Sequence, residues 1–113
     1  MSENQLDPEM IVSLKDILGD NFNSLIGQFE EDGQRRVDAL GPAVRERDYD
    51  TINKQAHGLK GSARNLGANL LAEHCDVLEV AGKAQQDANL EQTLAAIQQA
   101  FAAAVAELES HRT

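Results

Sequence analysis

The chain has 113 residues and a formal net charge of −9, with a pI near 4.6. This length fits a single domain over residues 1–113 and excludes a second catalytic domain. The negative charge repels polyanions, which argues against nucleic acid and anionic membrane surfaces as partners. Apolar residues make up 42% of the chain and aromatic residues 4%, with few β-branched runs, so the composition indicates an all-α protein.

The first predicted element is a short amphipathic helix after Asp7, with Pro8 at its first helical position and Gly19 as a left-handed cap. It is too short to be a full member of a bundle. We therefore expect it to lie across one end of the bundle, as a capping helix.

A second helix is predicted to begin at Asp20, and its apolar residues keep helical spacing up to Leu40. Gly33 lies inside this pattern, where a small residue allows close packing. Gly41-Pro42 is expected to end the helix, so that both prolines of the chain stand outside the periodic segments. Residues 43–47 are polar and are predicted to form either a loop or one extra helical turn.

Asp48 is the predicted N-cap of a central helix that ends at Gly67. Asn69 is expected to cap the next helix, and either Asp87 or Asn89 the last one, whose apolar seam has heptad-like spacing. Because the links are short, neighbouring helices are expected to run antiparallel. The predicted fold is therefore an antiparallel up-down-up-down four-helix bundle with a short N-terminal capping helix.

The central helix carries an apolar seam and, on another face, a second set of regularly spaced residues that burial in a core does not explain. The seam consists of Tyr49, Ile52, Ala56, Leu59, Ala63 and Leu66. At about 100° per residue, His57 points about 130° away from the middle of this seam. We therefore expect its imidazole to stand in solvent.

The positions that share the face of His57 are three, four and seven residues away. They hold Lys54, Lys60, Gly61 and Arg64, so the histidine is expected to lie in a cationic strip. A glycine inside a helix costs about 1 kcal/mol relative to alanine, and Gly58 repeats this cost. We interpret Gly61 as bare backbone that lets another molecule close over the imidazole.

The run His57-Gly58-Leu59-Lys60-Gly61-Ser62-Ala63, followed by Asn65-Leu66-Gly67-Ala68, resembles the H-x-L-K-G-S-A-x-x-x-G signature of the histidine-containing phosphotransfer (HPt) domain family. The resemblance implies a phosphorelay intermediate of two-component signalling. Its histidine would accept a phosphoryl group from the aspartyl phosphate of one receiver domain and transfer it to an aspartate of another. The implied partners are the receiver domains of a hybrid sensor kinase and of a response regulator.

The resemblance also implies roles for the residues around the phosphoacceptor, His57. Lys60 would face the phosphate and Gly61 would provide steric clearance. Lys54, Gly58 and Arg64 are the candidates for partner binding, although a solvated charged face remains the default interpretation for both cations. Gly58 departs from the family pattern, in which a small hydroxyl residue is common at this position. We expect no metal site and no cofactor in this chain, because the receiver supplies the Mg²⁺, and no kinase activity of its own.

Three alternative functions fit parts of the same pattern. A non-catalytic helical adaptor would bind a receiver or kinase domain through the same face without turning over phosphate. The phosphoacceptor segment of a sensor kinase usually has an acidic residue after its histidine, where this chain has Gly58. A hydrolase built on Ser62 and His57 is disfavoured, because Ser62 points away from His57 and no aspartate on that helix orients the ring.

The remaining histidines and the single cysteine are expected to be structural or solvated. Adjacent residues on a helix diverge by about 100°, so His74 and Cys75 are a poor chelating pair. Cys75 is expected to be buried and His111 to be a terminal surface residue. One cysteine forms no intrachain disulfide, no apolar run spans a bilayer, and residues 1–5 lack the features of a signal peptide. We therefore expect a cytoplasmic monomer.

Overall fold

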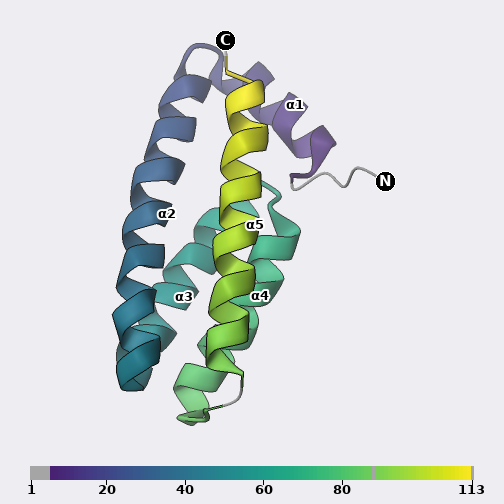
Figure 1. Ribbon diagram of the computed structural model, residues 1–113. Helices are drawn as coiled ribbons and strands as arrows, with labels where there is room; N and C mark the ends of the chain where they lie inside the picture. Colours follow the sequence, from purple (N-terminus) through teal and green to yellow (C-terminus); the bar gives the residue numbers. More distant parts are fainter. Residues whose placement is uncertain (1–5, 88, 113) are drawn as a thin grey trace.

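The computed structural model describes residues 6–87 and 89–112, and that part of the chain is built from helices without strands (Figure 1). The helices are α1 (Pro8–Leu18), α2 (Asn21–Glu46), α3 (Tyr49–Asn65), α4 (Asn69–Ala84) and α5 (Leu90–Ser110). Helices α2 to α5 run alternately up and down, so the predicted all-α class and antiparallel four-helix bundle are confirmed. None of these helices is both long and apolar enough to cross a membrane. Residues 1–5, on which the expectation of no signal peptide rests, lie outside the described part.

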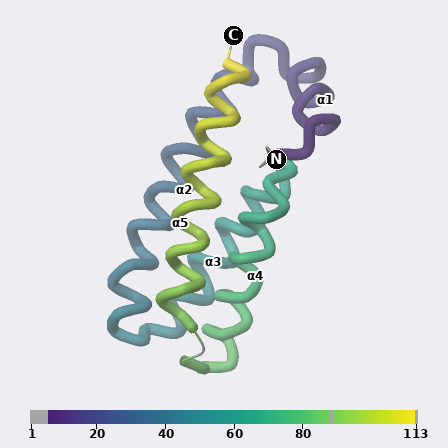
Figure 2. The backbone as a smooth tube through the Cα atoms, turned by 45° about the vertical axis from the view of Figure 1, so that its right-hand side comes forward, coloured from purple at the N-terminus to yellow at the C-terminus, as the bar shows by residue number. Residues whose placement is uncertain are grey.

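The four bundle helices differ in length, and this difference explains the position of α1. Helix α2 has 26 residues and α5 has 21, whereas α3 has 17 and α4 has 16. At about 1.5 Å per residue, the α3–α4 hairpin stops well short of the far end of α2. Figures 1 and 2 show α1 beyond the end of this hairpin, beside the first turns of α2. The predicted capping role of the N-terminal helix is therefore confirmed.

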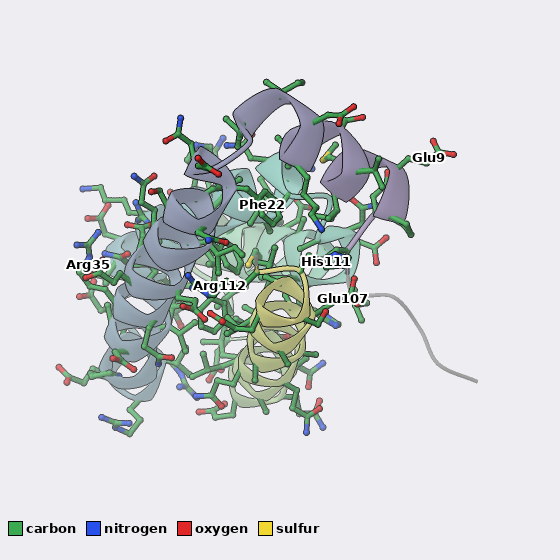
Figure 3. The ribbon with its side chains drawn as sticks, turned by 90° about the horizontal axis from the view of Figure 1, so that it is seen from above. Glu9, Phe22, Arg35, Glu107, His111 and Arg112 are labelled. Atoms are coloured by element: carbon green, nitrogen blue, oxygen red, sulfur yellow. The ribbon has the colours of Figure 1, made fainter. Side chains whose placement is uncertain are left out.

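Contacts at both ends of α1 hold it there. The side chain of Asp7 accepts hydrogen bonds from the backbone N–H groups of Glu9 and Met10, as predicted for an N-cap. The backbone N–H of Asp7 donates to the carbonyl of Gly67, 3.0 Å away, in the α3–α4 link. Gly19 ends the helix with a φ of 53°, which favours glycine. Figure 3 shows this end of the bundle from above, with α1 next to the start of α2 and the buried Phe22.

The prediction that Gly41-Pro42 ends the second helix is wrong, because α2 continues through Pro42 to Glu46. Of the two predicted states of residues 43–47, the extra helical turn is the observed one. Proline has no N–H group, so Pro42 cannot donate the helical hydrogen bond to the backbone carbonyl of Asp38. Both residues are exposed, so water can take the place of this donor. Ala43 and Val44 follow on the opposite side and are buried. Their burial favours a continued helix, which ends at Arg47 in the left-handed conformation.

The caps of the last three helices follow the predictions only in part. Asp48 caps α3, since its side chain accepts from the backbone N–H of Thr51 at 3.3 Å. The predicted cap at Asn69 is wrong: α4 begins at this residue after the buried Ala68, with no side-chain capping bond. Asn89 does occupy the position before α5, but it makes no capping bond, and Asp87 pairs with Arg47 instead.

The core lies between the four bundle helices and contains the apolar seam predicted for α3. The seam residues from Ile52 to Leu66 are buried, and Tyr49 packs partly buried at its end. Gly33 faces Phe101 so closely that an added Cβ would overlap the ring, which confirms that the small residue allows close packing of α2 and α5. Because the seam of α3 faces this core, the opposite face of the helix is left at the surface.

Candidate functional site

His57 lies on the exposed face of α3. Its side chain is 70% exposed, so the prediction that the imidazole stands in solvent is confirmed. One turn further along the same face, a Cβ added to Gly61 would meet nothing within 4 Å. The surface beside the imidazole is therefore open, as expected for a position that another molecule approaches.

Helix α4 supplies a carboxylate to the imidazole that the sequence analysis did not assign. The Nδ1 atom of His57 lies 2.9 Å from Oε2 of Glu79, whose side chain is only 19% exposed. The acid that contacts the ring comes from the neighbouring helix, 22 residues further along the chain, and not from α3 itself. The available signal was the acidic pair Asp76 and Glu79, which an antiparallel hairpin brings opposite His57 and Lys60.

Lys60 faces the carboxylates of α4. Its Nζ lies 2.6 Å from Oε1 of Glu79 and 3.1 Å from Oδ1 of Asp76, and its side chain is 14% exposed. The interactions with Glu79 and then Asp76 raise the pKa of Lys60 above its ordinary value. Burial by itself would raise the pKa of the Glu79 carboxyl, but the interactions with Lys60 and His57 outweigh it and hold that pKa below its ordinary value. Both groups are therefore charged at neutral pH.

A close approach of α4 to α3 makes this arrangement possible. A Cβ on Gly82 would lie 2.8 Å from the backbone N of Asn53 and 2.9 Å from the carbonyl O of Tyr49. The side-chain amide of Asn53 donates to the backbone carbonyl of Glu79 at 2.9 Å. Asn53 is one helical turn before His57, so this bond sets the height of Glu79 beside the imidazole.

On its other side, the exposed face of α3 is bordered by a cation from α2. The guanidinium of Arg36 occupies the space where a Cβ on Gly58 would be. Arg36 also donates to Oδ2 of Asp32 at 3.0 Å and to Oε1 of Gln55 at 3.1 Å. The sequence does not reveal this role of Arg36, since nothing local marks an arginine 21 residues before the histidine as its neighbour.

The expected cationic strip around His57 is in large part neutralised. Lys54 pairs with Asp50 of its own helix at 3.0 Å, and both side chains are mostly exposed. Lys60 is held by two carboxylates. Arg64 is exposed and borders a shallow depression between α3 and α4, whose lining includes Asp76. The face is therefore a mixed surface on which most charges are paired, and Arg64 is an exposed cation near its C-terminal end.

His74 and Cys75 take no part in this site. Within residues 6–87 and 89–112, no three His, Cys, Asp or Glu side chains are grouped so as to hold a metal ion. Cys75 is buried, as expected, and burial raises the pKa of its thiol to about 12. The thiol is therefore protonated at neutral pH and behaves as a small apolar group.

The comparison with known families agrees with the geometry. The model of the Hpt domain family matches residues 24–111, so the chain belongs to this family. It is a phosphotransfer intermediate in phosphorelay signalling, and proteins of this family interact with receiver domains.

A solved structure supports the assignment over nearly the whole chain. The chain is similar to the crystal structure of histidine-containing phosphotransfer protein B (HptB) from Pseudomonas aeruginosa PAO1, with a TM-score of 0.92 and 26% sequence identity. The match covers 98% of this chain and 96% of HptB. No curated protein sequence matches this chain.

Proposed function

We propose that His57 is the phosphoacceptor of this phosphotransfer protein. It takes the phosphoryl group from the aspartyl phosphate of a receiver domain in a hybrid sensor kinase and transfers it to an aspartate in the receiver of a response regulator. The observation that carries the proposal is the exposed imidazole, with one ring nitrogen held by Glu79 and the open backbone of Gly61 beside it.

The chemistry requires a neutral ring nitrogen with a free lone pair that an incoming domain can reach. Phosphoryl transfer depends mostly on positioning and electrostatic stabilisation, since charge spreads over the phosphoryl oxygens. This chain supplies the positioned nucleophile. The receiver supplies the aspartate and the Mg²⁺, so this chain needs neither a metal nor a kinase activity of its own.

The experiment incubates the protein with a receiver domain carrying ³²P on its aspartate, in the presence of Mg²⁺. We expect label on the wild type that is lost in acid and retained in alkali, as a phosphoramidate is. His57→Gln should accept no label. The control is His74→Gln, which replaces a histidine on α4 outside the site and should accept label at the wild-type rate. Label on His57→Gln, or none on the wild type with any receiver of the source organism, overturns the proposal.

The same variants test the adaptor alternative. An adaptor without turnover predicts that His57→Gln keeps both receiver binding and the biological output. Our proposal predicts that His57→Gln keeps binding and loses the output. A cytoplasmic location and a monomeric state stay predictions from the sequence.

A further inference from the structure

A guanidinium from α2 reaches the exposed face of α3 next to the phosphoacceptor candidate. A Cβ on Gly58 would lie 2.9 Å from Nε of Arg36 and closer still to its Cζ and Nη1. Gly58 directly follows His57 in the chain. Consecutive Cα atoms are about 3.8 Å apart, so the cation lies against the backbone next to the residue that carries the imidazole.

Two hydrogen bonds hold Arg36 in this position and leave part of the guanidinium free. Its Nε donates to Oδ2 of Asp32 at 3.0 Å, and its Nη1 donates to Oε1 of Gln55 at 3.1 Å. A guanidinium has five N–H donors. Within residues 6–87 and 89–112, the Nη2 group of Arg36 has no hydrogen-bond partner. The side chain is 29% exposed, so Nη2 can bind a group of another molecule without breaking either bond.

The charges on the two sides of His57 differ in sign. On the α2 side, Arg35 and Arg36 share one carboxylate, that of Asp32, so these three side chains carry one net positive charge. On the α4 side, two carboxylates share the ammonium of Lys60, which leaves one net negative charge there. A phosphoryl group is an anion, so it is attracted to the α2 side of the imidazole.

We propose that Arg36 is a catalytic residue of the phosphotransfer reaction, and that its Nη2 group contacts the phosphoryl oxygens next to His57. The proposal rests on His57 as the phosphoacceptor. Gly58 gives the guanidinium its access, because a side chain at position 58 would occupy the same space. Where a small hydroxyl residue is common in the family, this chain thus presents a cation from the neighbouring helix.

The transfer step defines what the guanidinium contributes. A ring nitrogen of His57 attacks the phosphorus with its lone pair, while the bond from phosphorus to the receiver's carboxylate breaks and its electron pair stays on that carboxylate. Charge spreads over the phosphoryl oxygens during this step, and Arg36 stabilises it through N–H donors. A guanidinium stays protonated in proteins, so Arg36 exchanges no proton. In the onward step an acceptor carboxylate attacks the phosphorus, and the electron pair of the N–P bond returns to the ring.

The first measurement of the contact needs no receiver domain. The protein is phosphorylated with phosphoramidate, a small donor that reacts with histidine directly, and the ³¹P signal absent from His57→Gln is followed against pH. A cation in contact with a phosphoryl group favours its more charged form and lowers its pKa. We expect the midpoint of this titration to lie at a pH at least about 0.5 lower in the wild type than in Arg36→Met.

A matched variant separates contact from the general loss of a cation. Arg45 is an exposed arginine nine residues further along α2. Arg45→Met removes the same charge and should keep the wild-type midpoint. A role of Arg36 in packing α2 against α3 would leave the midpoint of Arg36→Met unchanged, so this measurement also separates a catalytic role from a structural one.

Rates of transfer from a phosphorylated receiver then measure the effect on the reaction. We expect Arg36→Met to slow transfer at saturating receiver at least about tenfold, and Arg45→Met to keep the wild-type rate. Gly58→Ala should also slow transfer, because its Cβ displaces the guanidinium, but should have little further effect in an Arg36→Met background. Gly58→Ala reaches the same contact from α3, so it serves as the test variant if Arg36→Met fails to fold.

The proposal is overturned if Arg36→Met keeps the wild-type midpoint or the wild-type transfer rate. An equal shift of the midpoint in Arg45→Met also overturns it, since that result shows an effect of charge at a distance and not a contact. Failure of the proposed function is a different result, in which the wild type accepts no label from any receiver. The titration uses phosphoramidate, so it still reports whether Arg36 contacts a phosphoryl group on His57.

Discussion

The guanidinium of Arg36 on α2 lies against the backbone of Gly58 on α3, in the space that the Cβ of any other residue at position 58 would occupy. Hydrogen bonds from Arg36 to Asp32 and Gln55 fix the guanidinium there. This contact gives Gly58 a packing role next to the phosphoacceptor candidate. The expectation that Gly58 binds the partner stays a prediction, since the side chain bordering the surface at this point is that of Arg36.

Gly58→Ala tests this contact. The added Cβ should displace the guanidinium and break its hydrogen bond to Gln55, and this loss should offset the gain of about 1 kcal/mol that alanine brings to a helix. We therefore expect the free energy of unfolding in urea to change by less than about 1 kcal/mol. In an Arg36→Met background the same substitution should stabilise by the full amount. Equal effects in both backgrounds would show that the contact is not tight.

Gly61→Gln should slow phosphotransfer without harming the fold. The position is exposed and has open space around it, so the longer side chain meets nothing within the protein and helix propensity improves. A docking receiver, however, meets that side chain one turn from His57. We expect transfer at least about tenfold slower, with the circular dichroism spectrum and melting temperature maintained. Gly27→Gln, at an open position on α2, is the control. A Gly61→Gln protein with wild-type transfer would remove the steric role.

Gly82→Ala should destabilise the protein. Its Cβ would meet the backbone of α3 at Asn53 and Tyr49, which cannot move aside as a flexible side chain does. We expect a loss of about 1–3 kcal/mol in the free energy of unfolding. Gly27→Ala, with nothing within 4 Å of the new Cβ, should instead stabilise α2 by about 1 kcal/mol. Urea denaturation of both variants measures the difference, and a neutral Gly82→Ala would contradict the close approach of α3 and α4.

The pH dependence of stability should contain a contribution from Glu79. Interactions with Lys60 and His57 lower the pKa of this carboxyl in the folded state below 4.5, against the opposing effect of burial. The unfolded chain therefore binds a proton first as the pH falls, so this contribution is present above about pH 4.5 and is lost below it. Wild type and Glu79→Gln should differ in unfolding free energy at pH 7 and converge toward pH 3. A difference that is independent of pH would contradict the ion pair with Lys60.

The thiol of Cys75 should be unreactive in the folded protein. It is buried, and burial raises its pKa to about 12, so almost no thiolate exists at pH 8. We expect a thiol reagent such as dithionitrobenzoate to modify Cys75 at the rate of global unfolding, and rapidly in concentrated urea. Fast modification of the native protein would show that the α4 packing opens locally.

The features of the site that the sequence alone determined all lie on one helix, α3. The spacing from Tyr49 to Leu66 defines which side of α3 is buried, and His57 is on the opposite side by the geometry of a single helix. The antiparallel bundle followed from the short links between amphipathic segments. The family signature also lies within this one stretch, which is why it is visible in the sequence.

Tertiary structure decided whatever depends on two helices together. Helix α2 continues through Pro42, a residue that usually ends a helix, because Ala43 and Val44 after it are buried in the core. Glu79 and Arg36 became neighbours of the His57 face only through the packing of α4 and α2 against α3. Helical periodicity specifies the angle of a side chain around its own axis. The height and distance of that side chain relative to a residue on another helix depend on where the two helix backbones come closest. Small residues such as Gly82 allow that close approach, and the packing of the whole core determines where it occurs.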